Sequence, residues 1–121
     1  MLNVENVYIG DEIGTHKIMT RSGPVQIVSL PWIRKGEFMS LSGSKSSSPD
    51  DLNTAIESTI KVKLDQQIQK LDSTIPSILA GHISVTSAIT SSEKSMMLGK
   101  DYILDVKSLA RKELDYVALG H

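Results

Sequence analysis

The sequence predicts an α/β fold in which a helix packs obliquely on a sheet. Strand-like and helical segments alternate through the second half of the chain, which is typical of α/β layering. Near the N-terminus, two β-branched segments are joined by a Ser-Gly-Pro turn, which indicates a hairpin. Between these regions, apolar residues recur four apart over a long stretch, as they do in an amphipathic helix.

Composition narrows the class of protein. The chain has 121 residues with 13 basic and 14 acidic side chains, so its formal net charge is −1. That length allows one domain, and the near-neutral balance argues against holding nucleic acid mainly by overall charge. The chain has no cysteine, which excludes a disulfide scaffold, a thiolate zinc site and a cysteine nucleophile. Aromatic residues make up only 4% of the chain, so its core must depend on aliphatic packing. This composition leaves open that the chain is a piece of a larger protein.

The cellular location follows from what the sequence does not contain. No apolar run approaches the roughly 18–20 residues that cross a bilayer. The first residues, Met-Leu-Asn-Val-Glu, lack the basic and apolar regions of a secretory signal. We therefore expect a soluble, cytoplasmic chain that has no membrane partner.

Residues 1–35 are expected to hold three short strands. The strands are predicted over residues 7–9, 15–20 and 25–30, and Arg-Ser-Gly-Pro between the last two supplies the hairpin turn. Pro31 lacks an amide hydrogen for the sheet ladder, so it should end the third strand. Residues 36–48 are rich in serine and low in complexity, which predicts a flexible linker on the surface.

A helix is predicted over residues 49–73. Ser48 is a good N-cap and Pro49 suits the first helical position, with two aspartates following at the positive end of the helix dipole. The apolar stripe consists of Leu52, Ile56, Ile60, Leu64, Ile68 and Leu71. Each step of four advances about 40° around the helix, so the stripe winds across its surface. Ile75 precedes Pro76 and therefore disfavours helical geometry.

The last part of the chain, residues 77–121, reads as strand, loop and strand. Residues 77–82 form an apolar run, and the Ser/Thr-rich residues 84–100 are expected to form a long loop. Residues 102–106 read as another strand, and a brief helical turn over 109–114 precedes a final strand over 115–119.

Two of the three histidines directly follow a glycine at the end of an apolar strand. These Gly-His pairs are Gly81-His82 and Gly120-His121. In α/β sheets, ligands gather beyond the carboxyl ends of strands, and glycine there permits a sharp turn. Neutral imidazole is a common ligand of divalent metals, so the two pairs are candidate metal ligands. His16 has no such context and is interpreted as a solvated or cross-strand residue.

The last seven residues, Asp-Tyr-Val-Ala-Leu-Gly-His, resemble the D-Y-V-A-L-G-H-x-H motif of the SbcCD-type exonuclease family. This family supplies the nuclease subunit of double-strand-break repair complexes and belongs to the calcineurin-like metallophosphoesterases. Residues 76–85, with the following Ser-Ser-Glu at 91–93, are similar to the family's preceding Gly-His block. Residues 25–32 resemble its strand followed by Pro-Trp. The similar blocks occur in order along nearly the whole chain.

This resemblance implies a fold, an activity and partners. The fold is a partial metallophosphoesterase fold, half of a β-sandwich flanked by helices. The activity is manganese-dependent DNA exonuclease and endonuclease cleavage, in which two metal ions activate a water for phosphodiester hydrolysis. His82 and His121 map to ligands of the second manganese ion. The implied partners are DNA, an SMC-like ATPase subunit of the SbcC type, and a second copy in a homodimer.

The chain departs from the family pattern in its missing ligands. It contains no D-x-H and no N-H-D, and it ends at His121, before the x-His that closes the motif. We therefore expect residues 1–121 to be a single incomplete domain, a fragment with no catalytic residue of its own and no nuclease activity alone. This hypothesis requires an Asp-x-His more than fifty residues upstream in the gene and a histidine two residues after His121.

Two other functions stay open. The chain is alternatively a non-catalytic interaction module in which both Gly-His pairs are structural turns, or part of another calcineurin-like phosphoesterase, a nucleotide or protein phosphatase. The basic pairs Arg34-Lys35 and Arg111-Lys112 are candidate phosphate contacts, although isolated pairs are usually solvated surface.

Overall fold

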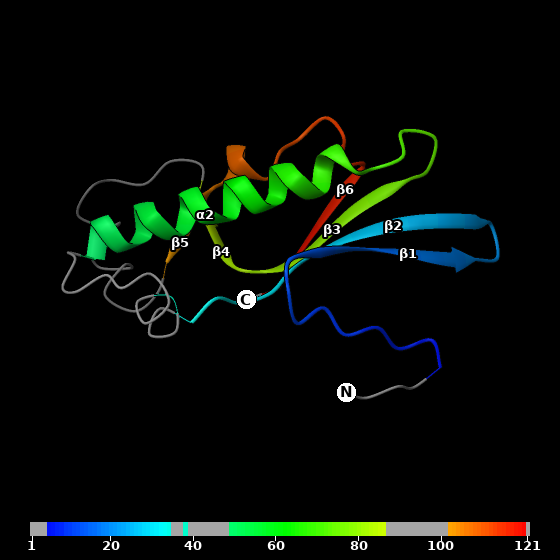
Figure 1. Ribbon diagram of the computed structural model, residues 1–121, viewed down its shortest axis with the longest axis horizontal. Coiled ribbons are helices and arrows are strands. Elements are labelled where there is room, and N and C mark those ends of the chain that lie inside the picture. The colour runs from blue at the N-terminus through cyan, green and yellow to red at the C-terminus, as the bar shows by residue number, and fades with distance from the viewer. Residues whose placement is uncertain (1–4, 35–37, 39–48, 87–101, 121) are drawn as a thin grey trace.

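A computed structural model describes residues 5–34, 38, 49–86 and 102–120. The chain forms a small α/β domain, in which one helix covers one face of a four-stranded mixed sheet (Figure 1). The helix is α2 (Pro49–Gln69), and the sheet strands in spatial order are β1 (Gly14–Thr20), β2 (Gly23–Leu30), β3 (Ser77–His82) and β6 (Tyr116–Gly120). β1 runs antiparallel to β2, whereas β2, β3 and β6 are parallel to one another. The predicted α/β class is confirmed.

The hairpin between β1 and β2 confirms the two strands predicted on either side of the turn. Gly23 has φ = +121°, a conformation that side chains rarely adopt and that glycine reaches without strain. The strand predicted over residues 7–9 is wrong. This segment has no strand geometry, and Val7, Tyr8 and Ile9 are about half exposed. Three apolar residues are not sufficient for a strand where none of the described strands pairs with them.

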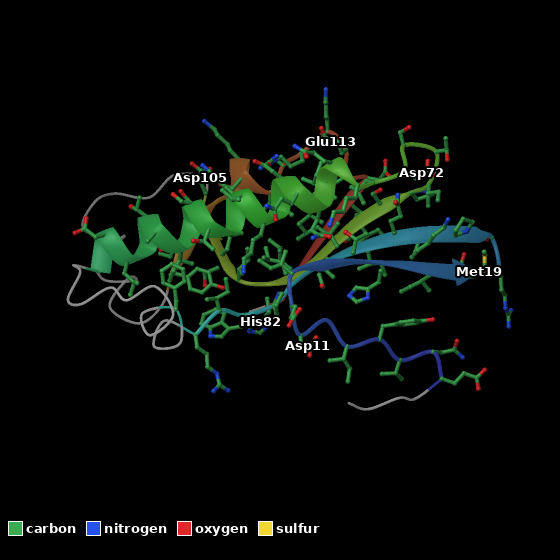
Figure 2. The ribbon with its side chains drawn as sticks, in the orientation of Figure 1. Asp11, Met19, Asp72, His82, Asp105 and Glu113 are labelled. Carbon is green, nitrogen blue, oxygen red and sulfur yellow. The ribbon has the colours of Figure 1, made fainter. Side chains whose placement is uncertain are left out.

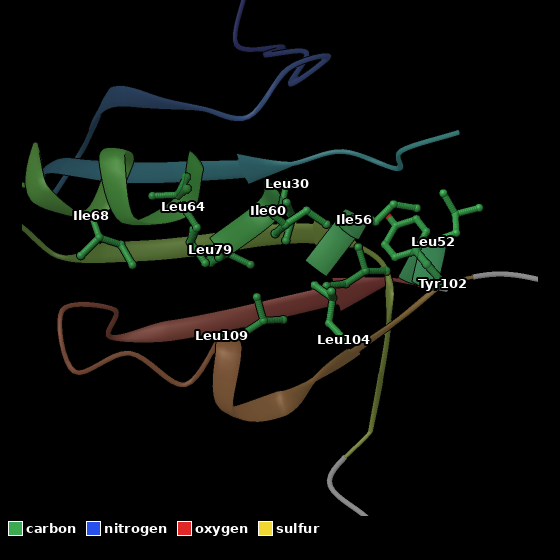
Figure 3. Packing of buried hydrophobic residues seen from close by; sticks show 12 residues of the cluster. Leu30, Leu52, Ile56, Ile60, Leu64, Ile68, Leu79, Tyr102, Leu104 and Leu109 are labelled. Atoms are coloured by element: carbon green, nitrogen blue, oxygen red, sulfur yellow. The ribbon is translucent and has the colours of Figure 1, made fainter. Parts of the chain in front are cut away.

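The apolar stripe of α2 forms the core with one face of the sheet. All of its members from Leu52 to Ile68 are buried, and they pack on Val28, Leu30 and Leu79 of the sheet (Figure 3). The helix ends at Gln69, four residues before the predicted end at 73. Its last turn tightens through hydrogen bonds from Lys70 N to Gln67 O and from Leu71 N to Ile68 O. The next amide, Asp72 N, donates to Oε1 of buried Gln26 in β2 at 2.8 Å, which draws the chain away from the helix axis.

A second, two-stranded sheet lies beside the first. It consists of β4 (Ser84–Thr86) and β5 (Ile103–Asp105), which are parallel. The prediction of a loop starting at residue 84 is therefore wrong for its first three residues, and 87–100 lie outside the described residues. The helical turn predicted over 109–114 is also misplaced, because a 3-10 helix spans Val106–Ser108 instead. Asp105 fixes its start by accepting a hydrogen bond from Lys107 N at 2.9 Å.

The sheet face away from α2 is largely uncovered by the residues that the structure describes. Strand alternation places a row of mainly apolar residues on this open face. The half-buried members of this row are Ile18, Ile27 and Ile78, and the exposed members are Ala80, Tyr116 and Ala118. Within the described part of the chain, only the N-terminal segment before β1 runs below this face (Figure 1). None of the described helices is long and apolar enough to cross a bilayer.

Candidate metal-ligand site at the ends of the parallel strands

The three parallel strands end at the same edge of the sheet. The register pairs Leu30 with Gly81 and Gly81 with Leu119, so β2, β3 and β6 finish level with one another. His82 is the last residue of β3 and is exposed at this edge. His121 lies outside the described residues, and the chain is described up to Gly120, its neighbour.

The two Gly-His pairs are offset by one residue. His82 pairs with Gly120, not with His121. A Cβ built on Gly120 would lie 3.7 Å from His82 Nδ1, an ordinary van der Waals contact, so the imidazole lies near β6 without requiring glycine there.

Neither glycine of the two Gly-His pairs makes the sharp turn predicted from the sequence. Gly81 and Gly120 both lie inside strands, and neither has a positive φ. At Gly81, an added Cβ would come within 3.3 Å of Leu119 Cδ2 and 3.4 Å of Leu30 Cβ. A side chain at 81 would therefore be crowded between the neighbouring strands, and Leu119 would have to shift by a few tenths of an ångström to admit it.

His82 has an aromatic neighbour that the sequence analysis did not assign to the site. Trp32 follows the end of β2, and its ring lies edge-to-face with the imidazole, with centroids 5.7 Å apart and an interplanar angle of 80°. Trp32 also contacts the buried ring of Tyr102 at 5.0 Å. Figure 2 shows His82 on the side of the sheet away from α2. Residue 32 lies beside the end of β3 because β2 and β3 are paired in parallel.

His16 and His82 line the same pocket, of about 490 Å³, between the N-terminal segment and the open face. His16 is half-buried and faces Ile27 across the hairpin, in agreement with its interpretation as a cross-strand residue. Its Nε2 lies 3.5 Å from Oγ of Ser29, a hydroxyl that donates to the carbonyl of Glu12 at 2.7 Å. The alternation of side chains along β1, β2 and β3 places both histidines on one face.

The described residues supply only part of a metal site. No group of three or more His, Asp or Glu side chains gathers among them. His82 offers one exposed imidazole, a donor that manganese, iron and zinc all accept. Manganese prefers a shell of about six ligands rich in carboxylate and water oxygen, so this donor fits one corner of such a site and does not complete it.

In the basic pair Arg111-Lys112, Arg111 makes polar contacts within the fold. Arg111 Nη1 lies 2.6 Å from Oδ1 of Asp65 on α2, and its Nε donates to the carbonyl of Ser108 at 3.1 Å. This arrangement holds the segment after the 3-10 helix against α2, which favours a structural role for Arg111 over a phosphate contact. Lys112 and Arg34 are exposed, and Lys35 lies outside the described residues.

Comparison with known proteins adds no assignment. No model of a protein family matches this sequence, and no curated protein matches it significantly.

Proposed function

We propose that this chain is the second half of a manganese-dependent metallophosphoesterase domain that hydrolyses DNA phosphodiesters in double-strand-break repair. The observation that supports this proposal most directly is the pairing of His82 with Gly120. It puts the residue that precedes His121 directly beside the first candidate ligand, at the edge of the sheet where α/β folds bind ligands. The resemblance of residues 115–121 to the nuclease motif supplies the identity of the family.

The open sheet face supports the same proposal. A half sandwich buries one face of its sheet under a helix and leaves the other for the second sheet. Ile18, Ile27 and Ile78 on the open face are apolar, as the inner face of a β-sandwich requires. The other half of the domain, with the remaining ligands, would pack on this face.

In this function the chain supplies nitrogen ligands. His82 and His121 would hold the second of two manganese ions through imidazole nitrogens. The two ions would supply Lewis acidity that polarises the phosphodiester and activates a water. Two imidazoles leave most of an octahedral shell to water, so the chain alone is inactive.

A manganese titration followed by NMR tests the ligand assignment. Paramagnetic Mn²⁺ should broaden the ring resonances of His82. His82→Ala should weaken binding at least about tenfold, the loss that already follows removal of an outer partner of a metal ligand. Ser73→Ala alters an exposed residue before the start of β3, at the opposite end of this strand from His82, and should bind as the unchanged chain does. Equal affinity of His82→Ala and the unchanged chain would refute the metal site and favour the interaction module.

The substrate class is tested in the full-length protein that carries this segment. His82→Ala should remove Mn²⁺-dependent hydrolysis of linear duplex DNA, whereas Ser73→Ala, at an exposed position outside this pocket, should retain it. Hydrolysis of a phosphate monoester with no cleavage of DNA would instead assign the protein to the phosphatases of the same superfamily.

A further inference from the structure

We propose that the N-terminal segment, residues 5–13, is a removable cover that blocks self-association through the open face of the sheet. The segment runs below this face, on the side of the sheet away from α2 (Figure 1). When the segment leaves, the open face packs on the same face of a second copy of this chain. The inference uses neither the metal nor the nuclease assignment and is therefore independent of the proposed function.

The segment has a closely fitted seat on Ser29, a buried residue near the end of β2. A Cβ built on Gly10 would lie 2.5 Å from the Cβ of Ser29, closer than real Cβ atoms approach another atom. Ser29 belongs to an inner strand of the sheet, whereas Gly10 is exposed, so a side chain at position 10 would displace the segment and not the strand. Gly10 has no positive φ, so space and not backbone conformation requires glycine there.

The segment is held at this seat and only lightly elsewhere. Ser29 Oγ donates a hydrogen bond to the carbonyl of Glu12 at 2.7 Å, beside the Gly10 contact. Residues 5–12 are all exposed, and Val7, Tyr8 and Ile9 are each more than half exposed. The pocket of about 490 Å³ beneath the segment shows that it does not fill the open face. Since little buried apolar area holds the segment, the contacts at Ser29 decide whether it stays in place.

The shape of the open face suits a second copy of the same face. The strand register aligns a line of small residues across the sheet, which consists of Gly14, Ser29, Ala80 and Ala118. The adjacent line on the same face carries larger side chains, those of His16, Ile27, Ile78 and Tyr116. In a two-fold pair of copies, the larger line of each copy lies over the small line of the other, as packed sheets interdigitate.

Charge favours the pair when the face is bare and opposes it when the segment is seated. Within the described part of the chain, none of the strand residues that alternate onto the open face is Asp, Glu, Lys or Arg. The segment carries three acidic side chains, those of Glu5, Asp11 and Glu12, and no basic one. Two covered faces would therefore bring like charges together, which disfavours their contact. Release of the segment removes this repulsion together with the steric block.

A matched pair of glycine substitutions tests the seat. In Gly10→Ala, the NOE between Hα of residue 10 and Hβ of Ser29 should disappear, while amides of β2 and β3 keep their protection from hydrogen exchange. A Cβ at Gly14 would meet nothing within 4 Å, so Gly14→Ala should keep the segment seated. This control also keeps the line of small residues, in which alanine already occurs twice. An NOE that persists in Gly10→Ala would overturn the inference.

Sedimentation equilibrium measures the effect on self-association. Gly10→Ala should raise the association constant at least about fivefold, because losing one hydrogen bond shifts the balance between seated and released segments by about that factor. Ser29→Ala removes the hydroxyl and keeps the Cβ contact, so it should give a smaller rise, and Gly14→Ala should match the unchanged chain. Unaltered association of Gly10→Ala would refute the blocking role. Weaker association would instead assign the contact between copies to the segment itself and refute it equally.

Two lysine substitutions in the Gly10→Ala background locate the contact between copies. Ala80 is exposed on β3, an inner strand of the open face, and Ala55 is exposed on α2. Ala80→Lys should abolish the gain in association, because it buries a charge between two apolar faces, whereas Ala55→Lys should retain the gain. Equal association of these two variants would contradict the assignment to the open face. All of these measurements are made without Mn²⁺, so their outcome is separate from that of the metal titration.

Discussion

At the scale of single residues, the turn from α2 into β3 shows how polar side chains direct the path of the chain. Gln26 of β2 is buried, and its amide bridges this turn: Oε1 accepts from Asp72 N, and Nε2 donates to Asp72 O at 2.9 Å and to Ser77 Oγ at 3.1 Å. Asp72 then closes the turn by accepting from Thr74 N at 2.9 Å and from Thr74 Oγ1 at 2.6 Å. These bonds place the first residues of β3 against β2.

The Asp72 carboxylate should make stability depend on pH. The side-chain and then the backbone hydrogen bond of Thr74 lower the pKa of Asp72 below its ordinary value. A lowered folded-state pKa contributes stability above the unfolded-state pKa, and this is lost as the pH falls through the folded-state pKa. Asp72→Asn should therefore have a lower urea midpoint than the unchanged chain at neutral pH and an equal midpoint near about pH 2.

Two neighbours in the same turn serve as controls. Thr74→Val removes the hydroxyl donor and keeps the amide, so it should give a smaller loss of the same sign. Ser73→Ala alters an exposed residue and should leave the midpoint unchanged. A gap between Asp72→Asn and the unchanged chain that persists in acid would contradict the electrostatic explanation.

At the scale of elements, one buried amide joins α2 to β5. Asn53 is 3% exposed, its Nδ2 donates to Ile103 O at 3.0 Å, and its Oδ1 accepts from Ile103 N at 2.6 Å. Asn53→Asp replaces the amide donor Nδ2 with a carboxylate oxygen, which then faces the carbonyl oxygen of Ile103. It should destabilise the fold by about 2–3 kcal/mol in chemical denaturation, the cost of an unsatisfied buried polar group near a charge.

Gln66→Glu makes the same amide-to-acid change at an exposed position of α2 and should leave stability nearly unchanged. Hydrogen exchange gives a local readout, because the Ile103 amide should exchange faster in Asn53→Asp only. Equal stability of the two variants would show that the Asn53 bridge carries no net free energy.

The elements that the sequence predicts correctly are those with a strong local signal. The stripe of α2 repeats over many residues, and the hairpin has both β-branched strands and a glycine that needs a positive φ. β4 was missed because its three residues, Ser84–Thr86, gain strand geometry from pairing with β5, which is distant in the sequence. The apolar residues 7–9 were mistaken for a strand because composition does not show whether a partner strand exists.

The same distinction, between features with a local sequence signal and features that depend on strand pairing, applies to the candidate site. The Gly-His spacing correctly placed His82 at the end of a strand, because strand ends have a local signature. The one-residue offset that pairs His82 with Gly120 and the approach of Trp32 depend on register between strands, which no local pattern reports.

At the scale of the whole molecule, the uncovered surface predicts self-association. The open face presents apolar side chains, and Tyr116 is 65% exposed. Within the four-stranded sheet, β1 and β6 are the outer strands, and an outer strand offers unpaired backbone groups to another chain. The weight-average mass in sedimentation equilibrium should therefore rise with protein concentration.

Tyr116→Lys should lower that association, because lysine on an outer strand opposes pairing with a second copy. Val62→Lys is the matched control, since Val62 is 57% exposed on α2 and lies away from the open face. A monodisperse monomer at high concentration would contradict association through this surface. Equal association of both variants would place the contact elsewhere on the molecule. If the rest of a nuclease domain normally covers the open face, adding that part should abolish association more completely than Tyr116→Lys does, because it buries the face and the edge together.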